Sequence, residues 1–224
     1  MTTPLDSAKA SLREQMRARV KNLSVAARGT ASALLCARLR ESPVWSAARC
    51  ILLFAPLPDE PDVWPLLNEA ITAGKTVALP AFVPGTKSYS ARQIIDPQRD
   101  IVAGQFGIRE PVAACAEVPL NRLDLVLVPG VAFDARGGRL GRGQGFYDRL
   151  LAGVRGTKWG VAFDEQIVDA VPVGPQDIPL NCILTPTRPL ESAPTSPSIL
   201  TLSSTSIWTT PRLELPLAPW RAPT

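Results

Sequence analysis

The chain has 224 residues, 46% of them hydrophobic, and its 24 lysines and arginines outnumber its 20 acidic residues to give a net charge of +4. No apolar run approaches the roughly 20 residues of a membrane-spanning helix, and the N-terminus lacks the apolar segment of a signal peptide, so we expect a cytoplasmic protein. The length suits one α/β domain with a core on both sides of a sheet. The sequence has no histidine, which excludes histidine-based triads, histidine general bases and most zinc or iron sites.

The remaining composition narrows the chemistry further. Cys36, Cys50, Cys115 and Cys182 are far apart and form no CxxC pair, so we expect reduced, mostly buried thiols. Catalysis must then rest on carboxylates, arginines, lysines, backbone amides and an oxygen-liganded metal. The positive charge suits an anionic substrate and would equally suit nucleic acid.

The first expected element is a helix that begins after Thr3 and runs to about Asn22. Threonine is a common cap, Pro4 suits the first helical position, and Asp6 can complete a capping box. The apolar stripe of this helix consists of Leu5, Leu12, Met16, Val20 and Leu23.

A second face of this helix is basic. Lys9, Arg13 and Arg17 are four residues apart and therefore lie together. On the helical pattern alone, the simplest interpretation is a solvated face. An arginine-rich transit peptide is the alternative, but Asp6 and Glu14 argue against it.

Further along the chain, strands alternate with helices. We expect helices over residues 25–40, capped by Ser24, and over residues 63–73, capped by Asp62. Expected strands are residues 51–54, 76–80, 125–128, 158–163 and 182–185, with an extended segment over residues 88–94. This alternation predicts a three-layer α/β/α sandwich around a mostly parallel, Rossmann-like sheet.

The most informative segment follows the apolar strand at residues 125–128. A loop over residues 138–145 holds four glycines and two arginines, and residues 146–151 then suit the start of a helix. Glycines let successive N–H groups turn toward one anion, and the helix start adds further donors. This pattern predicts a phosphate cradle, although such a loop can also be a simple tight turn. Its spacing matches neither the dinucleotide fingerprint nor the Walker loop.

The whole segment resembles the ATP loop of the 5-formyltetrahydrofolate cyclo-ligases (methenyltetrahydrofolate synthetases). The resemblance rests on VPGVAFD at residues 128–134 and on GGRLGRGQGFYD at residues 137–148. The KxxxR pattern of Lys9 and Arg13 and the GIREP element at residues 107–111 are also similar to that family. In total the resemblance covers about residues 5–188.

The resemblance implies a fold of the sugar-phosphate isomerase and CoA-transferase type (NagB/RpiA/CoA-transferase-like). It also implies Mg²⁺-dependent conversion of 5-formyltetrahydrofolate and ATP to 5,10-methenyltetrahydrofolate, ADP and phosphate, with the monoglutamate or a polyglutamate of the folate as substrate. We expect a monomer without nucleic-acid or membrane partners. In this mechanism the formyl oxygen attacks the γ-phosphate, N10 closes on the activated carbon, and phosphate leaves.

Site residues follow from the same resemblance. ATP would be bound by Lys9, Arg13, Gly138, Arg139, Leu140, Gly141, Arg142, Gly143, Gln144, Gly145, Phe146 and Tyr147. The folate would be bound by Leu57, Glu60, Arg142, Gly143, Gln144, Gly145 and Phe146. Tyr147 and Arg142 are the expected catalytic residues, and Asp148 and Asp177 the expected magnesium ligands.

Several of these residues have a plainer interpretation. Glu60 could be a charge at a helix terminus, and Asp148 could simply be an acid in the first turn of its helix. We expect Glu110 to be structural, with a position facing the substrate as the less favoured alternative. Gln144 and Phe146 differ from common family residues and should tune affinity, whereas a role for Gln176, often histidine in bacterial relatives, is in doubt.

Two other functions are compatible with parts of the sequence. One is a non-catalytic, nucleotide- or RNA-binding member of the same fold. The sequence argues against it, because it has no RNA-binding motif and its basic residues are not interleaved with aromatic ones. The other is a sugar-phosphate isomerase or CoA-transferase relative, against which the glycine-loop string argues. Residues 189–224, rich in proline, serine and threonine, are expected to be a poorly ordered extension.

Overall fold

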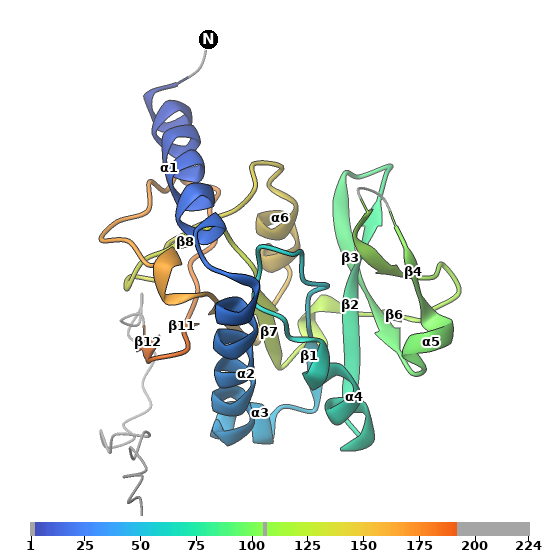
Figure 1. Cartoon of the computed structure of the whole chain (residues 1–224). Helices are drawn as coiled ribbons and strands as arrows, with labels where there is room; N and C mark the ends of the chain where they lie inside the picture. The colour runs from blue at the N-terminus through green and yellow to red at the C-terminus, as the bar shows by residue number, and fades with distance from the viewer. Residues whose placement is uncertain (1–2, 105–106, 192–224) are drawn as a thin grey trace, which may run out of the picture. The chain divides into compact units, whose positions relative to one another are not determined.

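An eight-stranded sheet forms the centre of the fold (Figure 1). The computed structural model describes residues 3–104 and 107–191; residues 1–2, 105–106 and 192–224 lie outside the description. The strands follow the order β12-β11-β10-β7-β1-β2-β3-β6. They are β1 (Cys50–Leu52), β2 (Thr76–Val83), β3 (Ser88–Ile94), β6 (Glu117–Val118), β7 (Leu125–Val128), β10 (Thr157–Val161), β11 (Cys182–Leu184) and β12 (Pro189–Glu191).

Five adjacent strands, β11, β10, β7, β1 and β2, run parallel, and the outer strands β12, β3 and β6 are antiparallel to their neighbours. All four residues of β7 are buried, as expected for a strand covered on both faces. The mostly parallel α/β sheet predicted from the sequence is confirmed. Two ribbons lie outside it: β4 (Ile101–Ala103) with β5 (Arg109–Pro111), and β8 (Ala132–Phe133) with β9 (Arg139–Leu140).

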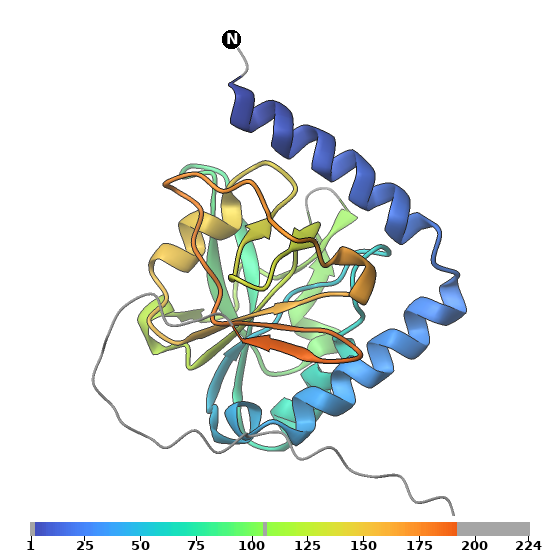
Figure 2. The same ribbon diagram turned by 90° about the vertical axis from the view of Figure 1, so that its left-hand side faces the viewer.

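Helices lie on both sides of the sheet. Figure 2 shows α1 (Pro4–Lys21) and α2 (Val25–Glu41) along one side and α6 (Phe146–Ala152) on the other. On the α6 side, Leu150 and Leu151 pack in one core cluster with Val126 and Val128 of β7. The other helical segments are α3 (Pro43–Ala47), α4 (Trp64–Thr72), α5 (Pro97–Asp100) and the 3₁₀ turns η2 (Leu120–Arg122) and η3 (Asp164–Gln166).

Local sequence signals account for the long helices. Thr3 and Asp6 form the predicted capping box of α1, and Ser24 caps α2 by accepting from the amide of Ala27. Within the described residues, none of the helices is both long and apolar enough to cross a membrane.

All four cysteines carry free thiols, and only Cys50 among them is not buried. Burial raises the pKa of Cys36 to about 11 and that of Cys182 to about 12. These two thiols therefore remain protonated and unreactive at neutral pH.

The described fold extends past the boundary expected at residue 188. Residues 189–191 form β12, which pairs with β11 through Ile183 and Leu190. Pro189 stands at the start of an edge strand, where a missing N–H is tolerated. The rest of the expected extension, residues 192–224, lies outside the described residues.

Candidate functional site

A cavity of about 570 Å³ opens at the carboxyl ends of the parallel strands. Its walls come from the loop after β1, the start of the loop after β7, the glycine loop, α6, α1, the loop before β11, and β3 with β5. Ligands of open α/β sheets bind at this edge. The cavity therefore collects segments that are far apart in the sequence.

A buried aspartate anchors the base of the glycine loop. Asp134 is 2% exposed and accepts hydrogen bonds from the backbone amides of Arg136, Gly138 and Val171, at 2.8, 3.0 and 2.7 Å. A Cβ on Gly138 would lie 2.6 Å from a carboxylate oxygen of Asp134. Glycine is required at 138 by this contact, and Gly138 does not line the cavity, unlike the other residues expected to bind ATP.

The part of the loop that faces the cavity adopts a backbone conformation that favours glycine. Gly143 and Gly145 have φ angles of 106° and 64°, a region that side chains disfavour. Gly145 is also the N-cap of α6. Positive φ values here let the chain turn sharply into the helix, as a loop built to surround an anion requires.

Helix α1 brings two of the expected basic residues to this loop. Met16 is buried against Val131, Leu140 and Val171, which fastens the helix to the β8–β9 ribbon. As a result, the Arg13 Nε donates to the Gly141 carbonyl oxygen at 2.9 Å. Arg13 is therefore not part of a simple solvated surface, whereas Arg17 on the same face is exposed.

The Lys9 ammonium, on the same helix, lies 2.6 Å from Asp177 Oδ2, which also accepts from the Gly174 amide. Burial acts to raise the pKa of Asp177, but the hydrogen bonds from Lys9 and Gly174 outweigh it and hold that pKa below its usual value. The structure thus pairs a predicted phosphate ligand with a predicted metal ligand.

A second such pair lies deeper. The Arg139 guanidinium donates to Asp148 Oδ1 at 2.8 Å, and only 3% of the Arg139 side chain is exposed. It also lies over the Tyr147 ring, 5.7 Å from the centroid, and its buried Nε has no hydrogen-bond partner among the described residues. Arg139 was expected to bind ATP; the structure places it in the cavity lining, where it is almost fully buried and orients Asp148.

Arg142 joins the glycine loop to the loop after β1. Its guanidinium lies 2.6 Å from Asp59 and 3.0 Å from Glu60. Glu60 is 8% exposed and also accepts from the Leu57 amide at 3.0 Å. Burial raises the pKa of Glu60 even though the positive charge of Arg142 opposes the shift. Glu60 is therefore a buried wall residue rather than a charge at the start of α4.

Aromatic side chains form another part of the wall. Tyr89 meets the rings of Phe146 and Tyr147 edge-on, with centroids 5.4 and 5.6 Å apart. Burial raises the pKa of both Tyr89 and Tyr147. Both phenols therefore stay protonated at neutral pH and can donate a hydrogen bond.

Tyr89 and Ile108 line the cavity and were not expected there, and Glu110, which was expected to be structural rather than substrate-facing, lines it as well. The alternating polarity of residues 88–94 was a usable signal, because every second side chain of such a strand shares a face. Ile108 and Glu110 belong to the GIREP element, but the element does not indicate which side chains face the cavity; they reach it through the pairing of β4 with β5.

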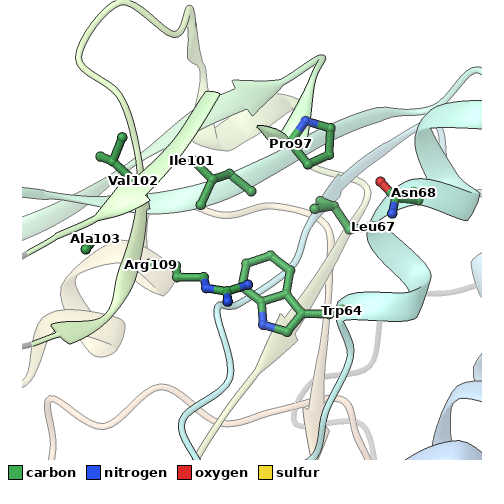
Figure 3. A pocket seen from close by; sticks show the side chains of 8 residues that line it. All are labelled: Trp64, Leu67, Asn68, Pro97, Ile101, Val102, Ala103 and Arg109. Carbon is green, nitrogen blue, oxygen red and sulfur yellow. The ribbon is translucent and has the colours of Figure 1, made fainter. Parts of the chain in front are cut away.

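A separate cavity of about 320 Å³ lies between α4 and the β4–β5 ribbon (Figure 3). Its lining residues include Leu67, Ile101 and Val102. The Arg109 guanidinium lies over the Trp64 indole there, 5.4 Å from the ring centroid. Arg109 lines both cavities, so its positive charge is directed toward Trp64 at their boundary.

Comparisons with known proteins agree with this geometry. Residues 6–186 match the model of the 5-formyltetrahydrofolate cyclo-ligase family. The chain is 37% identical over 159 residues to the 5-formyltetrahydrofolate cyclo-ligase of Escherichia coli K12, covering 67% of this chain and 85% of that one. It is 32% identical over 151 residues to the Mycolicibacterium smegmatis enzyme of that name, covering 63% and 76%.

Solved structures give the same result. The 5,10-methenyltetrahydrofolate synthetase of Aquifex aeolicus superposes with a TM-score of 0.76 at 32% identity, over 88% of this chain and 99% of that one. The Mycoplasma pneumoniae synthetase, with a TM-score of 0.64 at 20% identity over 80% and 98% of the two chains, shares the fold.

Proposed function

The chain belongs to the 5-formyltetrahydrofolate cyclo-ligase family, and from that premise we propose that the 570 Å³ cavity is its active site. The protein is an enzyme of one-carbon folate metabolism that converts 5-formyltetrahydrofolate to 5,10-methenyltetrahydrofolate in an ATP-dependent reaction. The observation that carries the assignment of the site is the meeting of the glycine loop, the basic face of α1 and two aspartates in one cavity.

The reaction asks for positioning and charge neutralisation rather than a protein nucleophile. The formyl oxygen attacks the γ-phosphorus and ADP leaves; N10 then attacks the activated carbon and loses its proton, and phosphate departs with the former formyl oxygen. Phosphoryl transfer of this kind is accelerated by alignment and by stabilising the charge of the phosphoryl group. A site without histidine, rich in arginine and backbone amides, suits this chemistry.

The phosphates of ATP would lie on the amides of residues 141–145. The left-handed conformations of Gly143 and Gly145 support this assignment, as do Lys9 and Arg13 beside the loop. When phosphate oxygens arrive, Lys9 and Arg13 can exchange contacts with Asp177 and Gly141 for contacts with the ligand. Arg139 would act through Asp148, because its guanidinium is almost fully buried and paired with that carboxylate.

Asp148 and Asp177 are the residues that would hold Mg²⁺. Both line the cavity, and the described residues contain no cluster of three acidic, cysteine or histidine side chains that could bind a metal alone. That donor set fits Mg²⁺, which commonly binds through one or two carboxylates, phosphate oxygens and water. When bound, the ion would neutralise phosphate charge, while Arg139 orients Asp148 and the Gly174 amide holds Asp177.

The folate would occupy the side lined by Leu57, Glu60 and Phe146. Tyr147, protonated at neutral pH, can donate to the reacting oxygen, and Arg142 can stabilise the negative charge of the phosphoryl group. Glu60 holds Arg142 at the boundary between the two substrates. We also propose that the enzyme acts as a cytoplasmic monomer.

One spectrophotometric assay tests the proposal. With 5-formyltetrahydrofolate and MgATP, we expect the absorbance of methenyltetrahydrofolate to appear, and we expect no product when ATP is omitted or EDTA is added. A Lys9→Ala, Arg13→Ala double variant should raise KM for MgATP about tenfold or more, because it removes two charged contacts. Equal rates with and without ATP, or no product at micromolar enzyme, would contradict the proposed function.

A further inference from the structure

Glu110 is a cavity carboxylate with an unusual setting. It belongs to β5, opposite Val102 of β4, and lines the active-site cavity together with Tyr89 and Ile108. Its side chain lies along the backbone of Gly104: a Cβ on Gly104 would come within 2.7 Å of the Glu110 Cγ and Cδ. The absence of a side chain at 104 therefore makes the slot in which Glu110 lies.

The charge environment separates Glu110 from Glu60, Asp148 and Asp177, the other acids of the cavity that are not exposed to solvent; Asp6, the remaining one, is exposed and caps α1. Glu110 has no ion pair among the described residues, and one oxygen, Oε2, accepts from the Phe82 amide at 3.4 Å. The neighbouring Arg109 is engaged with Trp64 (Figure 3). In contrast, three other cavity carboxylates each have a cation partner: Glu60 with Arg142, Asp148 with Arg139, and Asp177 with Lys9.

Burial raises the pKa of Glu110, with the Phe82 hydrogen bond opposing the shift. A half-buried carboxylate whose hydrogen-bonding capacity is largely unused gains most from donors supplied by a ligand. It repels phosphates and the glutamate carboxylates of a folate, which suit the basic side of the cavity better. Glu110 thus selects for a neutral group that offers hydrogen-bond donors.

The two substrates of the proposed function differ in what they offer. The pyrimidinone edge of a pterin presents two adjacent donors, the 2-amino group and N3–H, which match the two oxygens of a carboxylate. The corresponding edge of adenine presents one donor beside the N1 acceptor, and a carboxylate repels that acceptor. The aromatic rings of Tyr89 and Phe146, on the same side of the cavity, suit a flat ring.

We propose that Glu110 is a specificity-determining residue that binds the 2-amino and N3–H donors of the pterin ring of the folate substrate. This inference rests on the proposed function, because it assumes that a folate enters this cavity. It assigns to Glu110 a role in recognition beyond its contact with Phe82. It also gives Gly104 a role: an alanine there would displace the glutamate from its slot.

The test compares Glu110→Gln with wild type on two substrates. Glutamine keeps the shape and can still accept from Phe82, but it cannot receive two donors at once. We expect KM for 5-formyltetrahydrofolate to rise about tenfold to a hundredfold, as for the loss of a charged hydrogen bond, with KM for MgATP within about twofold of wild type. Glu117→Gln, an exposed glutamate on β6, is the matched control and should leave both constants unchanged.

A second measurement changes the substrate instead of the protein and compares wild type with Glu110→Gln. The 2-desamino-2-methyl analogue of 5-formyltetrahydrofolate lacks one donor, so wild type should use it about tenfold or more less efficiently than the natural substrate. Glu110→Gln should discriminate much less between the two compounds. If wild type accepts both equally, or if the variant loses activity toward both in parallel, Glu110 is structural and the inference is wrong.

Failure of the proposed function would look different. In that case wild type would form no product from 5-formyltetrahydrofolate and MgATP. Calorimetric titration of wild type and Glu110→Gln with 5-formyltetrahydrofolate alone distinguishes failure of the proposed function from failure of the inference about Glu110. Weaker binding by the variant supports the inference even without turnover. Equal binding by both proteins would overturn it.

Discussion

The ion pair between Arg139 and Asp148 makes Asp148 important for stability as well as for the proposed metal site. Asp148→Asn gives the buried Arg139 guanidinium, whose Nε has no hydrogen-bond partner among the described residues, a neutral acceptor in place of a carboxylate. We expect the free energy of unfolding to fall by about 1–3 kcal/mol. Urea unfolding at pH 7 measures this change.

Asp177→Asn is the matched comparison, because the Lys9–Asp177 pair is more exposed. It should cost less stability, because 16% of the Lys9 side chain remains exposed to water whereas only 3% of the Arg139 side chain does. If the two aspartates share one ion, each single variant should raise the Mg²⁺ concentration at half-maximal rate, and the double variant should be far less than additively worse. An unchanged Mg²⁺ midpoint in both single variants would exclude a shared ion.

Glu60 leads to a prediction about pH. Burial raises its pKa in the folded protein, so the folded state binds its proton more tightly than the unfolded state does. The stabilising contribution of Glu60 is complete below the unfolded pKa, near 4.5, and is lost as pH rises through the folded pKa. Wild type should therefore lose stability relative to Glu60→Gln between pH 4 and neutral pH.

Urea unfolding of wild type and Glu60→Gln at several pH values in this window measures the difference directly. Glu69→Gln is a useful control because the hydrogen bond from Arg40 lowers the pKa of Glu69, which reverses the sign of the trend. A difference between wild type and Glu60→Gln that does not change with pH would show that burial of Glu60 has no net effect on its ionisation.

At the scale of elements, alanine substitutions at two glycines, one inside and one outside the glycine loop, test the proposed phosphate site. Gly143 has φ of 106°, whereas Gly85, in the turn between β2 and β3, does not have a positive φ and has open space around it. Gly143→Ala should cost about 1 kcal/mol and raise KM for MgATP, because the side chain disfavours the loop conformation. Gly85→Ala should be neutral or stabilise by about 0.4–1 kcal/mol.

Thermal unfolding and initial-rate kinetics on both alanine variants are the relevant measurements. Similar behaviour of the two variants, with KM for MgATP unchanged in each, would mean that the amides of residues 141–145 do not surround the phosphates.

Elements whose ends are determined by local chemistry could be predicted from the sequence. Thr3 and Ser24 begin α1 and α2 where their caps indicate. By contrast, β2 was expected to end at Pro80 but continues to Val83. Its pairing with β1 stops at Ala78 while that with β3 goes on, so Pro80 lies where a missing N–H can be tolerated on an unpaired side. Whether a strand can contain a proline depends on which neighbouring strands pair with it, and the local sequence does not reveal that pairing.

The same distinction between local and long-range determinants explains which site residues could be predicted. The glycine loop is contiguous in the sequence, so its pattern of residues can be recognised directly. Glu110 and Tyr89 reach the cavity only through strand pairing, and the burial of Arg139 against Asp148 depends on how α6 packs. Contacts between distant segments were therefore the part of the site that sequence reasoning could not supply.

At the scale of the whole molecule, the position of β12 changes where the chain can be shortened. A chain that ends at Glu191 keeps the described sheet, whereas one that ends at Arg188 loses β12, including Leu190, which packs against the core. We expect the chain of residues 1–191 to keep full activity and its melting temperature within about 2 °C. The chain of residues 1–188 should lose about 2 kcal/mol, or roughly 4–8 °C.

Scanning calorimetry and the cyclisation assay on the two truncated chains test this boundary. Equal stability of both would mean that β12 contributes little to the fold. A large loss of activity in residues 1–191 would show that the last 33 residues, 192–224, take part in folding or catalysis.

The hydrogen bonds that Asp134 accepts from two separate loops limit how this enzyme can be re-engineered. One carboxylate joins the hairpin that carries the glycine loop to Val171, at the start of the loop that carries Asp177, and the Leu180 amide binds the Gly137 carbonyl oxygen from the far end of that loop. The two loops therefore form one mechanical unit. A loop exchange intended to change nucleotide preference must therefore replace residues 128–148 together with residues 168–180. Either segment alone would lose the hydrogen bonds that join Asp134 to Val171 and Gly137 to Leu180.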